Sequence, residues 1–358
     1  MKSITIANRR IACDAEPYVI AELSANHNGS LDTAKKIIME AKKAGADAVK
    51  LQTYTPDTIT LDCENEQFMI SGGLWDGRKL YDLYQEAHLP WAWHKPLFEF
   101  AKKHEITIFS SPFDNSAVDL LEDLNTPAYK IASFEAIDLP LIKYAAGTGK
   151  PVIISTGMAD DEEIQEAINA AHEAGCKQLA ILHCVSGYPA PASDYNLRTI
   201  PDMSARFGVV TGLSDHTLDN TTAITSVALG AAIIEKHFTL DRRNGGPDDS
   251  FSLEPPELKQ LCEGVKTAWQ SLGKIDYGRK SSEIGNVQFR RSLYFVRNLK
   301  EGHIIQTGDV RSVRPGFGIP PKHIDEIVGK QITCDVSFGT AVKWELIADN
   351  PSRKSNPV

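Results

Sequence analysis

An alternation of short apolar runs with helical stretches, repeated eight times, constrains the fold of this chain more than any other feature. Apolar runs of this kind are typical of parallel strands that are buried on both faces. The predicted strands lie at 19–21, 48–51, 106–109, 128–131, 152–154, 179–182, 209–210 and 233–234. Helical patterns follow the strands, for example at 33–44, 117–124, 162–174, 220–229 and 256–272.

Eight such repeats within about 270 residues predict a (β/α)8 barrel. A doubly wound parallel sheet is the alternative fold. Such sheets usually have fewer strands, and no Gly-rich phosphate fingerprint follows the first predicted strand. A short hairpin is expected before the barrel, with strands at 4–6 and 11–13 and a turn at Asn8 and Arg9.

The composition changes after Leu272, which indicates a second domain. A polar segment rich in Gly and Ser follows and is expected to be a linker. The next 60 residues or so contain short β-like runs at 292–296, 331–333 and 341–343. A unit of that size is near the lower limit for independent folding, so we expect it to dock on another surface. The expected division is a barrel at 1–275, a linker at 276–289, a small domain at 290–350 and a tail at 351–358.

One connection in the predicted barrel is unusually long, because about forty residues separate Thr53 from His94. This segment contains Trp75, Trp91 and Trp93 together with two tyrosines. Long insertions on the catalytic face of a barrel are usually lids or specificity elements. The alternative is a helix that only covers the side of the barrel.

The overall composition excludes several classes of function. The chain has 358 residues and a net charge of −9, which argues against general nucleic-acid binding. No apolar run approaches the ~20 residues that span a bilayer, and the N-terminus lacks the apolar core of a signal peptide. We therefore expect a cytoplasmic protein without a membrane partner. The six cysteines are scattered and are expected to be free thiols.

Polar residues follow each predicted strand, at the face where barrel enzymes hold their ligands. His216 and His237 follow two successive strands, and imidazoles from neighbouring strand ends can converge on one divalent metal. Two unrelated loop histidines are the alternative. Lys50 and Lys130 lie inside apolar runs, where an unpaired ammonium group is costly, so they indicate an anionic substrate with a phosphate. The alternative is that local carboxylates neutralise these lysines.

Seven of these strand-end motifs together resemble the sialic acid synthase family. They are Ala21–Gly29, Val49–Gln52, Phe109–Phe113, Tyr129–Glu135, Ser155–Met158, Gly212–Thr217 and Glu235–Thr239. The small domain, with the loop Arg314–Gly318, resembles the antifreeze-like (SAF) domain of that family. Within the family, the segments Leu74–Gly77, Leu80–Tyr84 and Pro90–Trp91 are similar to the pseudaminic acid synthase branch rather than the N-acetylneuraminate branch.

The resemblance implies a condensation of phosphoenolpyruvate with a free amino-sugar, with release of phosphate. It implies that a divalent metal, Mn, Mg or Co, is held by His216 and His237. It also implies a domain-swapped homodimer in which Arg314 reaches the partner's sugar. Catalytic roles fall to Glu22, Glu135 and the two histidines. Substrate binding falls to Lys50, Gln52, Ser111, Lys130, Ser133, Ser155, Ser186, Tyr188, Ser214, Asp248 and Arg314.

Ser186 departs from the family pattern, since sialic acid synthases have Asn there, so its contact to phosphate is lost or made through water. N-acetylneuraminate or legionaminate synthesis is the nearest alternative, with the same chemistry on a different sugar. A different class of function is a sugar-sensing protein with an inactive barrel. The retained histidines and lysines argue against that class.

Overall fold

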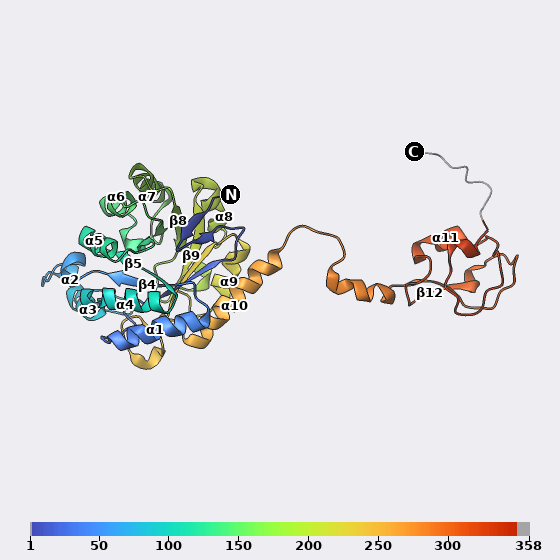
Figure 1. Cartoon of the computed structure of the whole chain (residues 1–358), viewed down its shortest axis with the longest axis horizontal. Helices are drawn as coiled ribbons and strands as arrows, with labels where there is room; N and C mark the ends of the chain where they lie inside the picture. Colours follow the sequence, from blue (N-terminus) through green and yellow to red (C-terminus); the bar gives the residue numbers. More distant parts are fainter. Residues whose placement is uncertain (1, 349–358) are drawn as a thin grey trace. The chain divides into compact units, whose positions relative to one another are not determined.

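The structure is a computed structural model that describes residues 2–348. Eight parallel strands close into a barrel in the order β10–β3–β4–β5–β6–β7–β8–β9 (Figure 1). They are β3 (Tyr18–Glu22), β4 (Ala48–Thr53), β5 (Thr107–Pro112), β6 (Tyr129–Ile131), β7 (Val152–Ser155), β8 (Leu179–Cys184), β9 (Val210–Asp215) and β10 (Ile233–His237). The predicted (β/α)8 fold is confirmed. The expected tail at 351–358 lies outside the described residues.

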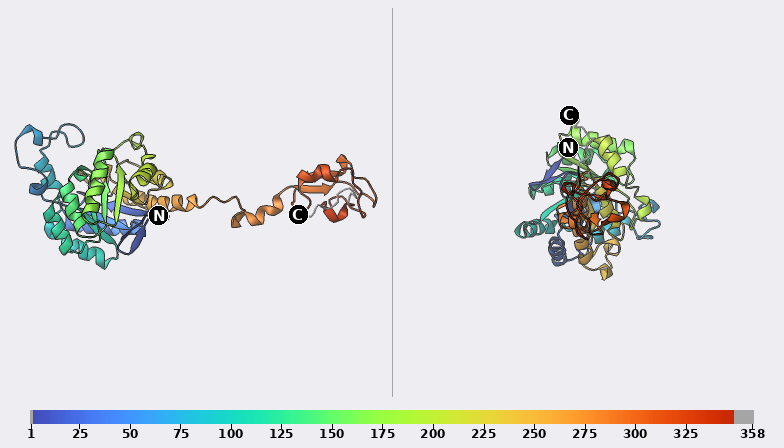
Figure 2. Two further views of the ribbon diagram at one scale, coloured as in Figure 1. Left: turned by 90° about the horizontal axis from the view of Figure 1, so that it is seen from above. Right: turned by 90° about the vertical axis from the view of Figure 1, so that its right-hand side faces the viewer.

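Helices surround the strands on the outside of the barrel (Figures 1 and 2). Polar caps set where several of them begin: Ser30 accepts from Thr33 N, and Asp160 accepts from the backbone of Glu162 and Glu163. For this reason these helices begin one or two residues before the predicted ranges. The helices are α1 (Leu31–Ala44), α4 (Trp91–Lys103), α5 (Asn115–Asp123), α6 (Leu139–Gly147), α7 (Asp161–Glu173), α8 (Thr199–Phe207), α9 (Thr221–Ala228) and α10 (Pro255–Leu272).

A hairpin of β1 (Ile4–Ile6) and β2 (Arg9–Ile11) precedes the barrel. The sequence prediction misplaced its second strand by two residues, because the turn lies at Ala7 and Asn8 instead of Asn8 and Arg9. Both turn residues have positive φ, as two-residue hairpin turns often require. The apolar side chains of Ile4, Ile6 and Ile11 pack in the same buried cluster as the barrel interior.

Side chains inside the barrel change from apolar to polar along the strands. The interior cluster includes Ile20, Ala48, Phe109, Ala128, Ile153, Leu182 and Ile233. Residues two positions later have the same orientation in a strand. In the same order they are Glu22, Lys50, Ser111, Lys130, Ser155, Cys184 and Glu235. At the carboxyl ends of the strands the barrel interior is therefore lined by buried polar side chains, and the rest of the interior is an apolar core.

The long insertion follows β4 and contains α2 (Pro56–Ile59) and α3 (Leu80–Ala87). Between these helices the chain turns back on itself, with a bridge between Met69 and Lys79. The insertion projects from one end of the barrel, where it appears as a blue loop in Figure 2. It is therefore a partly irregular excursion rather than a helix that only covers the barrel side.

A second compact unit begins at Lys274. It opens with a 3-10 helix at Ser281–Phe289, inside the segment expected to be a linker. β11 (Ser292–Phe295) pairs antiparallel with β12 (Val310–Val313), and α11 (Ile324–Ile327) follows. β12 was not predicted, because its sequence Val-Arg-Ser-Val has little apolar character. The runs predicted at 331–333 and 341–343 form only isolated bridges. Within 2–348, no helix has both the length and the apolar character to cross a bilayer.

Candidate active site

A chain of buried ion pairs crosses the polar face of the barrel. Lys50 Nζ lies 3.0 Å from Glu22 Oε2 and 3.3 Å from Glu235 Oε1. Lys130 Nζ lies 3.3 Å from the same Glu235 oxygen. All four side chains are almost completely buried. The lysines are therefore neutralised by carboxylates in this structure, which was the open alternative.

The two carboxylates have opposite protonation preferences. Burial raises the pKa of Glu22 to about 7, although the Lys50 charge partly opposes it. Burial also acts on Glu235, but the Lys130 and Lys50 charges prevail and hold its pKa below the usual value. Carboxyl groups whose environments drive their pKa values apart are suited to different roles in one reaction. Glu22 is thus poised to exchange a proton near neutrality, whereas Glu235 remains a fixed negative charge.

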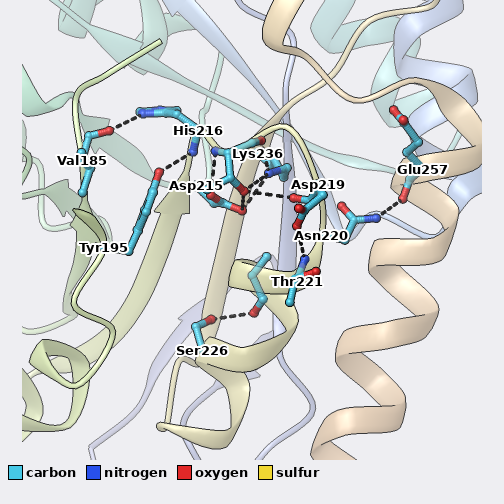
Figure 3. A network of polar contacts seen from close by, with 12 residues as sticks. Val185, Tyr195, Asp215, His216, Asp219, Asn220, Thr221, Ser226, Lys236 and Glu257 are labelled. Atoms are coloured by element: carbon cyan, nitrogen blue, oxygen red, sulfur yellow. Dashed lines mark hydrogen bonds and ion pairs between the residues drawn. The ribbon is translucent and has the colours of Figure 1, made fainter. Parts of the chain in front are cut away.

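Glu235 is the one charged residue of this cluster that the sequence prediction missed. It lies two residues after the apolar Ile233 and two before His237, so strand alternation points all three inward. Lys236 has the opposite orientation: its Nζ lies 2.7 Å from Asp215 Oδ2 and donates to Thr217 O (Figure 3). Extending the predicted strand to His237 would have identified Glu235.

Five serines lie around the lysines, and their hydroxyl groups differ in how well they are satisfied. Ser111 Oγ accepts from Lys50 Nζ at 3.2 Å, and Ser214 Oγ donates to Glu235 at 3.4 Å. Ser133 Oγ lies 3.4 Å from the Cys184 sulfur. The buried hydroxyl oxygens of Ser155 and Ser186 have no hydrogen-bond partner.

Gly157 allows this hydroxyl cluster to form. A methyl group on Gly157 would overlap Ser186 Oγ and would lie 2.9 Å from Ser133 Oγ. Buried hydroxyl groups without a protein partner are rare, so those of Ser155 and Ser186 are candidates for hydrogen-bonding a ligand. Hydroxyl donors beside two ammonium groups are suited to a phosphate or carboxylate.

His216 and His237 converge as predicted, with ring centroids 5.5 Å apart. The Nδ1 atom of His216 lies 2.8 Å from Val185 O (Figure 3). Because a carbonyl only accepts, this contact assigns the proton to Nδ1 and leaves Nε2 as a potential ligand atom. His237 Nδ1 is buried without a partner, and burial holds the pKa of His237 well below its usual value.

Three further predicted residues border the same face. Gln52 Nε2 donates to Glu22 Oε1 at 2.9 Å. Asp248 is hydrogen-bonded by the Ser24 hydroxyl and, at 3.3 Å, by Ala25 N. Glu135 has one buried carboxylate oxygen without a partner, and burial raises the pKa of Glu135 to about 7.

Tyr188 lies against the histidine pair, with its ring centroid 4.4 Å from that of His216. Arg314 belongs to the second unit, where it is exposed in the loop after β12. The structure therefore brings all the predicted site residues of the barrel to one face, and Arg314 is described separately with its own unit.

The chain belongs to the NeuB family, whose model matches residues 37–277, and a SAF domain model matches residues 290–348. The chain is 45% identical over 332 residues to the pseudaminic acid synthase of Campylobacter jejuni strain 81-176, covering 92% of this chain and 96% of the relative. It is 42% identical to that of Helicobacter pylori, over 88% and 93% of the two chains.

Solved structures give the same result. The sialic acid synthetase of Leptospira borgpetersenii has a TM-score of 0.71 and 31% identity, over 81% of this chain and 96% of that one. The spore coat polysaccharide biosynthesis protein SpsE of Bacillus subtilis has a TM-score of 0.66 and 32% identity, over 97% and 99%. The predicted family and its domain composition are confirmed.

Replacing Glu235 with Gln tests the ion-pair chain, because the two buried ammonium groups then lose their shared counter-charge. We expect Glu235→Gln to lower the free energy of unfolding by roughly 3 kcal/mol, as measured by urea unfolding. Glu173→Gln is the matched control, since Glu173 pairs with Lys143 on the exposed surface of the same barrel. Equal, small effects of the two substitutions would show that the buried pairs contribute no more than a surface pair.

The pH dependence of stability tests the environment of Glu135. Its folded-state pKa of about 7 lies above the ordinary 4.5, so the folded chain binds this proton more tightly than the unfolded chain. The Glu135 contribution to stability therefore falls as pH rises through that window. Glu135→Gln cannot ionise, so its stability relative to wild type should rise by about 2–3 kcal/mol between pH 5 and 8. A difference that is independent of pH would contradict the raised pKa.

Proposed function

We propose that this chain condenses phosphoenolpyruvate with 2,4-diacetamido-2,4,6-trideoxy-L-altrose and water to give pseudaminic acid and phosphate. The observation that carries the proposal is the convergence of two ammonium groups, unpaired serine hydroxyls and two imidazoles on one barrel face. The names of the relatives favour this sugar, since the pseudaminic acid synthases are 42–45% identical and the N,N'-diacetyllegionaminic acid synthase of C. jejuni is 38% identical.

The charged cluster supplies the binding site for phosphoenolpyruvate in this proposal. Lys50 and Lys130 bind its carboxylate and phosphate, and Ser111, Ser133, Ser155, Ser186 and Ser214 add directed donors. Gln52, Glu135, Tyr188 and Asp248 contact the sugar. These roles place the anion at the lysines and the sugar toward the histidine side of the face.

The reaction then forms one C–C bond between the substrates and one C–O bond to water, and it breaks the C–O bond to phosphate. The methylene carbon of phosphoenolpyruvate attacks the aldehyde carbon of the open-chain sugar, and positive charge develops at the former enol carbon. Glu22 lies beside this region and stabilises that charge while it accepts a proton from the attacking water. The resulting tetrahedral carbon expels phosphate, the departing phosphate takes the proton of the new hydroxyl group, and the carbon becomes the ketone. Glu135 delivers the proton that the aldehyde oxygen gains.

The histidine pair fits a divalent metal, Mn, Mg or Co, in the chemistry of its donors. In His216, Nε2 is the ring nitrogen that does not contact Val185 O, although the ring also interacts with the Cys184 thiol. The low pKa of His237 keeps that ring in the neutral form that metals bind. Among residues 2–348 no cluster of three or more candidate ligands occurs. Two imidazoles are fewer than the three protein ligands of typical catalytic zinc sites, so water and substrate would have to complete the coordination of an ion held here. A bound ion supplies Lewis-acid polarisation of the aldehyde oxygen.

We further propose a domain-swapped homodimer in the cytoplasm, where phosphoenolpyruvate is available. The small second unit carries an exposed Arg314 beside Pro315 in a turn-rich loop. A guanidinium group has directed donors that an N-acyl carbonyl can accept. In this arrangement Arg314 completes the sugar site of the partner subunit.

Phosphate release tests the proposed reaction and its sugar. We expect release from phosphoenolpyruvate that depends on the diacetamido-trideoxy-altrose, with kcat/KM at least about tenfold above that for N-acetylmannosamine or the legionaminate precursor. The free enzyme without sugar is the control for simple hydrolysis. Preference for either of the other two sugars would overturn the sugar assignment and leave the reaction class intact.

Metal binding tests the histidine pair independently of turnover. Titration of Mn²⁺ into the chelator-treated protein should show one site, and His237→Ala should weaken it by at least about tenfold because one imidazole ligand is lost. His183→Ala is a control, since His183 contacts Tyr195 O and has the outward orientation in β8. Unchanged Mn²⁺ affinity in His237→Ala would exclude this site.

Subunit complementation tests the domain swap. Arg314→Ala and Lys130→Met chains should each be weakly active, and mixed dimers should regain activity because one of their two sites carries neither lesion. Subunit exchange is verified by mass. No recovery in verified mixed dimers would mean that each barrel uses its own second unit.

A further inference from the structure

The insertion after β4 packs one side chain, Trp75, against loops of the barrel. Its tip is a hairpin at 69–79, in which Ile70 N donates to Arg78 O at 2.8 Å. Within 71–77, Trp75 is partly buried and all the other residues are exposed. Leu74, directly beside it, is 50% exposed. The hairpin therefore presents a single large side chain to the rest of the protein.

Trp75 contacts two loops of the candidate site. Its ring centroid lies 5.9 Å from that of Tyr188, and its Nε1 donates to Pro247 O at 3.2 Å. Tyr188 in turn packs against His216, at 4.4 Å, and against Phe251, at 5.3 Å. Trp75, Tyr188, Phe251 and the histidine pair thus form one aromatic wall. The hydrogen bond of Trp75 attaches it to Pro247, the residue before Asp248.

This wall is apolar on the side of Trp75. The indole has one hydrogen-bonding group, its N–H, and Pro247 O already accepts from it. The indole therefore offers a substrate only apolar ring surface. The nearest charged group is the Asp248 carboxylate beside Pro247, and it already accepts from the Ser24 hydroxyl and from Ala25 N. Glu22 and Lys50 come from β3 and β4. Aromatic faces bind the C–H surface of sugars well, but they satisfy no hydroxyl group.

We propose that Trp75 is a specificity-determining residue that selects an amino-sugar with a methyl group instead of a hydroxymethyl group at C6. This inference rests on the proposed function, because it assigns the part of the site that recognises the sugar. A hydroxyl group buried against the indole loses its hydrogen bonds to water and gains no protein partner. A methyl group makes no hydrogen bonds to water, so its burial carries no such cost. Discrimination of this kind is of the order of 10- to 100-fold.

The experiment compares two sugars that differ only at C6: the 2,4-diacetamido-2,4,6-trideoxy-altrose and its 6-hydroxy counterpart. The readout is the ratio of their kcat/KM values at saturating phosphoenolpyruvate, together with the KM for phosphoenolpyruvate. Trp75→Ala and Trp75→Gln should each lower the ratio by about tenfold with that KM unchanged. Trp75→Phe keeps an apolar ring and should retain most of the preference. Leu74→Ala, on the exposed side of the hairpin, is the control and should match wild type.

The inference is overturned if the Ala and Gln variants lose activity on both sugars by the same factor, or keep the wild-type ratio. Trp75 would then only stabilise the loops that contain Tyr188 and Pro247. Trp75→Phe distinguishes poor folding of the smaller variants from loss of the wall, because it keeps an aromatic ring at this position although it lacks the N–H that bonds Pro247 O. A wild-type enzyme that condenses both sugars equally overturns the inference and leaves the reaction class intact. A wild-type enzyme that condenses neither overturns the proposed function itself.

Discussion

The candidate site depends on the burial of two ammonium groups that share two carboxylates. The series Glu22–Lys50–Glu235–Lys130 alternates in charge, and each neighbouring pair lies within about 3.3 Å. Isolated ammonium groups at these positions would cost several kcal/mol, and the shared carboxylates offset that cost. Lys50 has two carboxylates and a hydroxyl, whereas Lys130 has Glu235 alone, and burial lowers its pKa. An incoming anion therefore improves the environment of Lys130 most.

The pattern of apolar and polar residues along the strands explains how much of the molecule could be predicted from sequence. The barrel was predictable because eight short apolar runs alternate with helical stretches, and most of the site residues lie at the ends of those runs. Asp248, Arg314 and the individual roles came from the family resemblance. Glu235 was missed because a strand that enters a polar lumen loses its apolar character, so the predicted strand stopped at Ile234. The pairing of each lysine also could not be predicted, since it depends on which strands become neighbours when the barrel closes.

Contacts between residues far apart in the sequence also could not be predicted. The insertion could be recognised as a lid or specificity element from its length and aromatic content. The sequence did not indicate which of its tryptophans meets the site, because Trp75 reaches Tyr188 and Pro247 only through the fold of the hairpin. In the second unit, β12 escaped prediction for a related reason: its partner β11 supplies the pairing that its own composition does not suggest.

The central claim is that Lys50 and Lys130 bind the anionic substrate rather than serve only as structural ion pairs. Calorimetric titration of phosphoenolpyruvate into wild type, Lys50→Met and Lys130→Met tests it most directly. Met retains the apolar stem without the charge, and circular dichroism verifies that each variant is folded. We expect each variant to bind phosphoenolpyruvate at least about tenfold more weakly, with the larger loss for Lys130→Met. Wild-type affinity in both folded variants would contradict the claim.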